Sequence, residues 1–224
     1  MFELQGITVI VGGFMSVDGK IAPANRNGRE FTHFMTPEHT KILHEIRSSV
    51  DAVIVGVDTV IADDPSLTVR AVQGKNPLRI VLDSNARTPL NSKILNINEA
   101  PTLIVVSKNA PQERIAALKS KNVEVLASSA ERSKALQELM DALKPRGVKR
   151  VLVEGGAEVR WSFFERKLVD ELFVWVMPYI WGGRDAPTLV GGSGFLKAEC
   201  AVPLKVKSME QVEGILILWF SVGA

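Results

Sequence analysis

The sequence predicts an α/β domain with a mostly parallel central sheet, helices on both faces of that sheet and an antiparallel hairpin at its C-terminal edge. Short apolar, β-branched segments alternate with segments of helical periodicity over most of the chain, which is typical of a parallel sheet with helical crossovers. The last strands follow one another without a helix between them, which predicts the antiparallel edge. We find no internal repeat and no linker, so we expect one domain over residues 1–224.

The first half of the chain begins with a buried strand at residues 7–11, followed by a turn-rich loop that reaches to about His33. Thr36 then has the position of a helix N-cap and Pro37 that of the first helical residue, and apolar side chains recur at helical spacing as far as Val50. Further buried strands are expected at residues 51–57, 78–82 and 102–106.

The second half continues the alternation and then ends on two strands. Helices are expected at residues 111–120 and 131–143, and a third from Gly156 to about Lys167. Strands are expected at residues 123–126, 150–153 and 169–177, with the closing hairpin at 202–210 and 215–220.

Composition argues against several classes of function. The 27 basic and 25 acidic side chains give a net charge of +2, too little for the concentrated basic face that nucleic acid or an anionic membrane requires. Cys200 is the only cysteine, so paired-cysteine zinc sites and internal disulfides are excluded, and His33, His39 and His44 lack the spacing of a metal site. No apolar stretch has the roughly 18 residues of a membrane helix, and no basic flank of a signal peptide is present. We therefore expect a cytoplasmic protein without a bound metal.

The first candidate site is the Gly155-Gly156 turn between a predicted strand and a predicted helix. Two glycines let a ligand approach the backbone closely, and the free N–H groups of the helix start favour an anion. Glu154 would repel a phosphate, so it is expected to face a cation, an amine or sugar hydroxyls. A plain tight turn also explains the glycines, and a surface ion pair also explains Glu154.

The second candidate site is the segment 58–70, which leaves a buried strand and carries acids, hydroxyls and Arg70. We interpret this segment as irregular, with a turn at Asp64-Pro65. Together with Arg47, Arg70 would supply the planar donors that suit a phosphate monoester. Solvated surface charges are the alternative interpretation of both arginines.

Two further loops carry polar groups. After the strand at 78–82, Ser84 and Arg87 suit a ribose 2′-phosphate, whereas Asp83 suits a free ribose diol; on balance the loop favours NADPH. The turn that contains Asp18 and Lys20 either closes over a substrate or is a plain hairpin turn.

These segments together resemble a known enzyme family. The resemblance is carried, in order and spacing, by SVDGKIAP (16–23), DAVIVGVDTVIADDPSLTVR (51–70), NPLRIVLDSNAR (76–87), VEGGAEV (153–159) and LVDELFVWVMPYIWGG (168–183). They are similar to the reductase family of riboflavin biosynthesis, which includes the reductase domain of the bacterial deaminase–reductase and the stand-alone archaeal and fungal enzymes. The resemblance covers nearly the whole chain.

The resemblance implies a dihydrofolate-reductase-like fold, a homodimer and NADPH as the hydride donor. It also implies a phosphorylated pyrimidine substrate, 2,5-diamino-6-ribosylamino-4(3H)-pyrimidinone 5′-phosphate or its deaminated relative, whose opened ribosyl group accepts hydride at C1′ to give the ribitylamino product. The alternatives are a reductase of the same fold that acts on a pterin or another imine, and a nucleotide-binding module without catalytic activity.

The resemblance also implies roles for individual residues. Glu154 and Lys20 are expected to act at the reacting ribosyl group, with Glu154 or Asp63 stabilising the positive charge of the imine. The cofactor contacts that it implies are Thr59, Asp63, Ser84, Gly155, Gly156 and Ala157, to which the chemistry of the loop after the strand at 78–82 adds Arg87. The expected substrate contacts are Arg47, Leu67, Arg70 and Glu154.

Two departures from the family pattern affect these expectations. The zinc deaminase domain of the bifunctional proteins needs a His-x-Glu and a Pro-Cys-x-x-Cys motif, which a chain with one cysteine lacks. We therefore expect a stand-alone reductase that acts on the diamino substrate. The loop before the first helix reads Phe31-Thr32-His33-Phe34 where the family usually has serine and tryptophan, so we assign no contact to it.

Overall fold

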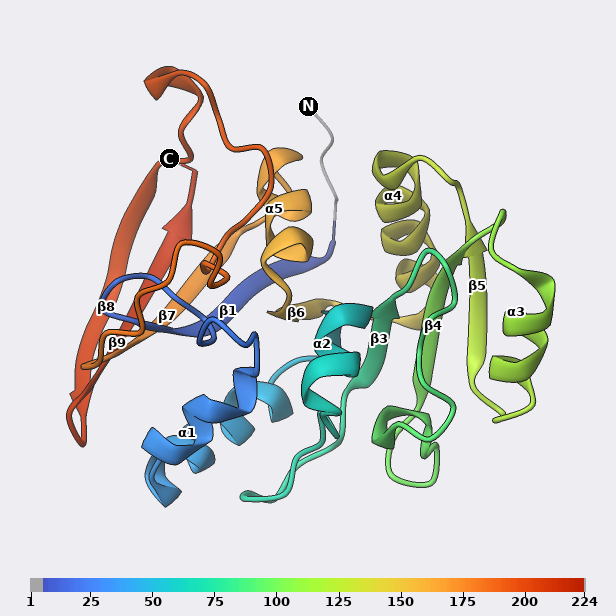
Figure 1. The fold of residues 1–224 in the computed structure, drawn as a ribbon, viewed down its shortest axis with the longest axis horizontal. Helices are drawn as coiled ribbons and strands as arrows, with labels where there is room; N and C mark the ends of the chain where they lie inside the picture. Colours follow the sequence, from blue (N-terminus) through green and yellow to red (C-terminus); the bar gives the residue numbers. More distant parts are fainter. Residues whose placement is uncertain (1–5, 224) are drawn as a thin grey trace.

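The computed structural model describes residues 6–223, which form one nine-stranded sheet in the order β5-β4-β3-β2-β6-β1-β7-β9-β8. All pairs from β5 to β7 are parallel, whereas β9 runs antiparallel to β7, and β8 to β9. The hairpin β8–β9 forms one edge of the sheet and β5 the other (Figure 1). The strands are β1 (Thr8–Ser16), β2 (Ala52–Gly56), β3 (Leu78–Leu82), β4 (Thr102–Ser107), β5 (Glu124–Ser128), β6 (Arg150–Gly155), β7 (Glu171–Met177), β8 (Leu204–Val212) and β9 (Ile215–Val222).

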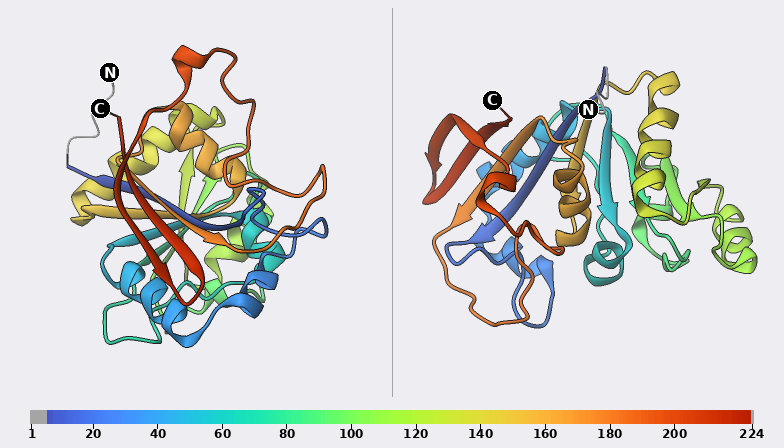
Figure 2. Two further views of the ribbon diagram at one scale, coloured as in Figure 1. Left: turned by 90° about the vertical axis from the view of Figure 1, so that its left-hand side faces the viewer. Right: turned by 90° about the horizontal axis from the view of Figure 1, so that it is seen from above.

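Both faces of the sheet are covered by helices. Every residue of β2 is buried, and its side chains alternate between two cores: Val53 and Val55 lie in one, Ala52 and Ile54 in the other. The first core includes side chains of α1 (Pro37–Ser48), α2 (Val57–Asp63) and α3 (Gln112–Lys119), and the second those of α4 (Arg132–Leu143) and α5 (Ala157–Glu165). The left view of Figure 2 shows α1 on one side of the strands and α4 and α5 on the other. The predicted α/β class, with its antiparallel C-terminal edge, is confirmed.

The start of α1 is capped as the sequence predicts. Thr36 accepts a hydrogen bond from His39 N at 3.4 Å, His39 Nδ1 accepts one from Thr36 N at 3.1 Å, and Pro37 occupies the first turn. The other ring nitrogen, Nε2, lies 2.8 Å from Val212 O and donates to it. His39 therefore ties α1 to the C-terminal hairpin.

The interpretation of residues 58–70 as wholly irregular is wrong, because residues 57–63 form α2. Val57 and Val60, three positions apart, are buried against the sheet, and Asp58 lies in the first turn, where the helix dipole favours a negative charge. The helix ends at Asp63; its C-cap, Asp64, has φ 39° and precedes Pro65, a position where helical backbone is disfavoured. The short length of the helix and its β-branched residues concealed it in the sequence.

The first strand is longer than predicted, because β1 continues through Gly12 and Gly13 to Ser16 and pairs with β7. Glycine is required here by packing. A Cβ atom on Gly12 would lie 2.1 Å from the Phe173 ring, and one on Gly13 would lie 2.5 Å from the guanidinium of Arg160. These close contacts come from β7 and α5, which are distant in the sequence.

No helix within residues 6–223 is long and apolar enough to span a membrane. Within the same residues, no cluster of three or more metal-ligating side chains is found.

Candidate functional site

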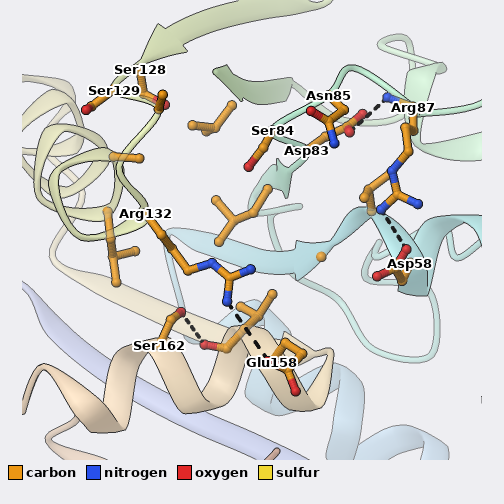
Figure 3. A pocket seen from close by; sticks show the side chains of 18 residues that line it. Asp58, Asp83, Ser84, Asn85, Arg87, Ser128, Ser129, Arg132, Glu158 and Ser162 are labelled. Carbon is orange, nitrogen blue, oxygen red and sulfur yellow. Dashed lines mark hydrogen bonds and ion pairs between the residues drawn. The ribbon is translucent and has the colours of Figure 1, made fainter. Parts of the chain in front are cut away.

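A cleft of about 240 Å³ lies beyond the carboxyl ends of β2, β3, β4 and β5, where parallel sheets commonly bind ligands (Figure 3). The first turns of α2, α4 and α5 complete its walls. Two predicted cofactor contacts, Ser84 and Arg87, line this cleft. Its other polar lining residues are Asp58, Asp83, Asn85, Ser128, Ser129, Arg132, Glu158 and Ser162.

Asp83 does not present its carboxylate to the cleft. The residue is 1% exposed, and its oxygens accept hydrogen bonds from Arg87 N at 2.8 Å, Thr88 N at 2.7 Å and Thr88 Oγ1 at 2.7 Å. The carboxylate is thus used to hold the loop after β3 in shape. This removes the objection that Asp83 posed to a 2′-phosphate at this loop.

Two arginines border the cleft, and each has an acidic partner. Arg87 Nη2 lies 2.7 Å from Asp58 Oδ1, and Arg132 Nη1 lies 4.0 Å from Glu158 Oε2. Sequence reasoning missed Arg132 and Glu158 because they come from α4 and α5, and only the strand order brings those helix starts to the edge where β3 ends.

The Gly155-Gly156 turn lies against α2. Gly155 ends β6, and Gly156 is the N-cap of α5 with φ 92°, a conformation that favours glycine. A Cβ atom on Gly155 would lie 3.0 Å from the Thr59 side chain. Thr59 and the two glycines are therefore neighbours, as expected for three contacts of one ligand. Ala157 begins α5, and its carbonyl accepts a hydrogen bond from Gly191 N at 3.1 Å.

Asp63 lies at the end of α2 and faces the loop before α1. Its Oδ1 accepts a hydrogen bond from Gly28 N at 3.0 Å, and its carbonyl accepts one from Arg29 Nε. Burial raises the pKa of the Asp63 carboxyl, and the contact with Gly28 opposes that rise. Asp63 is not among the residues that line the cleft.

Glu154 and Arg47, which the sequence treats as separate substrate contacts, form one ion pair. Arg47 Nε lies 2.9 and 3.2 Å from the two carboxylate oxygens, and Nη2 lies 2.9 Å from Oε1. The two side chains are 11% and 9% exposed. These three contacts fix the orientation of the carboxylate. Because the pair is buried, loss of either partner would leave an uncompensated charge.

Arg70 and Leu67 follow α2 in the segment that ends at β3. The Arg70 side chain is exposed, and its Nη1 donates to Thr68 Oγ1 at 2.7 Å. Leu67 is 3% exposed with φ 52°, and its side chain packs in the core.

His44 anchors this segment, and the sequence analysis did not assign it. Its Nδ1 accepts hydrogen bonds from Arg70 N and Ala71 N, both at 2.7 Å, so the ring is neutral with its proton on Nε2. Burial, followed by the charges of Arg47 and Arg70, lowers the pKa of His44 from 6.5 to about 4. The position of His44 one turn before Arg47 on α1 is the only sequence signal that pointed to it.

The turn that contains Asp18 and Lys20 is pinned to the loop after β7. Asp18 accepts hydrogen bonds from Ser16 Oγ, from Trp181 N at 3.2 Å and from Gly182 N at 2.8 Å. These contacts, that from Ser16 first, lower the pKa of the Asp18 carboxyl. Lys20 Nζ donates to Ala186 O at 3.2 Å. These contacts hold the segment as a turn, and its closure over a substrate stays a prediction.

A buried arginine that sequence reasoning also missed joins these segments. Arg160 of α5 donates to Gly12 O at 3.0 and 3.2 Å, to Leu189 O at 3.2 Å and to Glu154 O. Burial lowers the pKa of Arg160 to about 10. The residue holds the end of β6, and with it Glu154, against β1 and the loop after β7.

The family model of the RibD C-terminal domain matches residues 7–218. The chain belongs to this family. The predicted family and its fold are thereby confirmed, and the relatives of the chain are named as reductases.

Relatives named as stand-alone proteins match along most of their length. The chain is 42% identical over 201 residues to an Aquifex aeolicus protein, covering 89% of each, and 41% identical over 217 residues to a Methanothermobacter thermautotrophicus protein, covering 96% of this chain and 97% of that one. Both are named 2,5-diamino-6-ribosylamino-4(3H)-pyrimidinone 5′-phosphate reductase.

Solved structures of the family have the same fold. An Acinetobacter baumannii RibD structure is similar with a TM-score of 0.79 and 26% identity, and the match covers 98% of this chain but 59% of that one. The Saccharomyces cerevisiae riboflavin biosynthesis reductase Rib7 has a TM-score of 0.73 at 20% identity, with 100% of this chain and 92% of that one covered, and shows the fold alone.

Proposed function

We propose that this chain is a single reductase domain that reduces the ribosyl group of 2,5-diamino-6-ribosylamino-4(3H)-pyrimidinone 5′-phosphate to the ribitylamino product in riboflavin biosynthesis. The observation that carries this proposal is the match to relatives of that name along 88 to 97% of their own length. The bifunctional RibD relatives match at a lower identity, 32 and 34% against 40 to 42%, which favours the diamino substrate.

We further propose NADPH as the cofactor, which would supply the hydride. The residues fit a phosphorylated dinucleotide: Gly156 is the N-cap of α5, whose first N–H groups favour an anion, and Ser84 and Arg87 line the cleft. The burial of Asp83 supports NADPH over NADH at the loop after β3, because a free carboxylate at the end of this strand would favour a free ribose diol. Thr59 and Ala157 would complete the contacts near the turn.

On the substrate side, Glu154 is the group best placed to stabilise positive charge on the sugar-linked nitrogen. Arg47 contacts its carboxylate and Arg160 contacts its backbone, so the carboxylate is held in one orientation. Little free energy is then needed to reorient this charge during the reaction. Arg70 has an exposed guanidinium with donors to spare and would bind the phosphate monoester. Lys20 would lie beside the ribose chain.

The test of this function is the oxidation of NADPH, followed at 340 nm, with the diamino pyrimidine, the deaminated pyrimidine and a pterin supplied separately. Turnover fastest with the diamino compound supports the proposal. Turnover confined to a pterin, or binding of NADPH without turnover of any of the three, would contradict it.

The role of Glu154 is tested by Glu154→Gln, which keeps the shape of the side chain but removes its charge. We expect kcat/KM to fall by about 100-fold or more, the loss typical of a preorganised electrostatic group. Glu124→Gln is the matched control, since Glu124 also pairs with an arginine, Arg146, but stands at the start of the edge strand β5, away from the carboxyl ends of the strands. Equal kcat/KM for both variants would remove the assignment.

We also propose that the chain forms a homodimer and acts in the cytoplasm. The edge strand β8 supports self-association, because Leu204, Val206 and Met209 on it are 44%, 59% and 66% exposed. Light scattering on the purified protein should give twice the chain mass, and Val206→Lys should shift the mass toward the monomer. A monomer in the unmodified protein would contradict the dimer without affecting the reductase assignment.

A further inference from the structure

The cleft contains a second arginine that neither the sequence analysis nor the proposed function uses. Arg132 is the first residue of α4, and its side chain, 69% exposed, extends across the cleft toward α5 (Figure 3). Ser84 and Arg87 reach the same cleft from the loop after β3, on the other side of it. The cleft is therefore bordered by cationic side chains from two separate segments.

The contact that now holds Arg132 is weak. Its Nη1 lies 4.0 Å from Glu158 Oε2, and among the residues described the guanidinium makes no hydrogen bond. Both side chains are well exposed, and exposed ion pairs of this kind contribute little to stability. Glu158 also has a second partner, because its Oε1 accepts a hydrogen bond from Gly192 N at 2.9 Å. Arg132 can thus leave Glu158 at small cost to the fold.

The local structure of α4 does not account for an arginine at this position. A positive charge in the first turn of a helix is disfavoured by the helix dipole. The neighbouring acidic residue, Glu131, does not compensate Arg132, because its carboxylate contacts Ser133 and Lys134. From this position, the arginine side chain extends over the cleft.

We propose that Arg132 is a specificity-determining residue that binds the 2′-phosphate of the adenosine ribose, together with Ser84 and Arg87. Its planar donors would contact the phosphate from α4 while Ser84 and Arg87 contact it from the loop after β3. A free ribose diol carries no charge that Arg132 could bind. Arg132 therefore raises the affinity for the phosphorylated cofactor alone. This inference rests on the proposed function, because it assumes that the cleft holds the adenosine end of the cofactor.

The test measures binding rather than turnover. Isothermal titration of the full chain with 2′,5′-ADP and with 5′-AMP compares two fragments that differ only in the 2′-phosphate. We expect Arg132→Gln to weaken 2′,5′-ADP by about 10- to 100-fold, the loss of one charge-assisted contact, and to change the affinity for 5′-AMP by less than about two-fold. Arg146→Gln, which removes an arginine outside the cleft, should change neither affinity.

Three outcomes would overturn the inference: unchanged affinity of Arg132→Gln for 2′,5′-ADP, equal weakening of both fragments, or equal affinity of the unmodified protein for the two. Circular dichroism and the melting temperature verify that the variants are folded. Failure of the proposed function is distinguishable, since it would appear as absence of substrate reduction by the unmodified protein with either NADPH or NADH. A reductase that uses NADH equally well would overturn the role of Arg132 and leave the reductase assignment in place.

Discussion

Replacing His44 tests whether one buried imidazole holds the Arg70 segment in place. His44→Leu removes the acceptor for the N–H groups of Arg70 and Ala71, whereas His44→Asn keeps an oxygen near the position of Nδ1. The two variants differ little in size, so their comparison isolates the hydrogen bonds from the packing of α1.

The size of the effect follows from the burial of the ring. His44 is 2% exposed, and each buried N–H group left without an acceptor costs about 1–3 kcal/mol. With two such groups, on Arg70 and Ala71, we expect His44→Leu to lower the free energy of unfolding by about 2–6 kcal/mol. If the segment shifts to recover hydrogen bonds with water, the cost falls but Arg70 is displaced, and KM for the phosphorylated substrate rises instead.

His44 also predicts a pH dependence of stability. The folded state favours the neutral ring of His44. Its pKa is lowered from 6.5 to about 4, because the ring is buried and lies near the positive charges of Arg47 and Arg70. The stabilisation is complete above pH 6.5 and is lost as the pH falls from 6.5 through about 4. At about 1.4 kcal/mol for each pKa unit, the loss is up to about 3 kcal/mol.

The assay is urea unfolding between pH 4 and 8, together with steady-state kinetics at neutral pH. The unmodified protein should lose stability toward pH 4, and both variants should lose less because they lack the titrating ring. His44→Asn should keep KM close to that of the unmodified protein, while His44→Leu should not. A His44→Leu variant with unchanged stability, pH dependence and KM would refute the reasoning.

Three further predictions concern the substrate phosphate, the turn between β6 and α5 and the loop after β3. Arg70→Ala should raise KM for the phosphorylated substrate by about 10- to 100-fold and leave that for the dephosphorylated compound unchanged; steady-state kinetics with both compounds would show a uniform change if the phosphate binds elsewhere. Gly156→Ala should lower the free energy of unfolding by about 1–3 kcal/mol, because φ is 92° at this residue, and a variant as stable as the unmodified protein in thermal unfolding would argue against strain there. Asp83→Ala should lower the free energy of unfolding by about 3 kcal/mol or more and weaken NADPH binding, because three hydrogen bonds of Asp83 shape the loop that carries Ser84. An unchanged affinity for NADPH in a calorimetric titration would show that the loop keeps its shape without these bonds.

The positions of most strands and helices could be predicted because they depend on local patterns. The apolar run of β3 was located to the residue, and the cap of α1 was recognised from Thr36 and Pro37. The helix α2 was missed because seven residues, several of them β-branched, give too little helical periodicity. The full length of β1 was missed because Gly12 and Gly13 are explained only by side chains that pack on them from β7 and α5.

The candidate site was only partly predictable for the same reason. Gly155, Gly156, Ser84 and Arg87 stand at strand ends, where a sequence pattern reveals them. The buried Arg160 gave no such signal, because its partners lie on three other segments.

The sequence by itself determined the α/β class, the family and the residue types that stand at the carboxyl ends of the strands, since each depends on residues adjacent in the chain. Only the tertiary structure decided how those residues are used. Asp83 accepts hydrogen bonds within its own loop, and Glu154 forms an ion pair with Arg47. His44 accepts a hydrogen bond from the backbone of Arg70, and Arg132 lines the same cleft as Arg87. The physical reason is that hydrogen bonds and ion pairs depend on distances between segments, and strand order sets those distances.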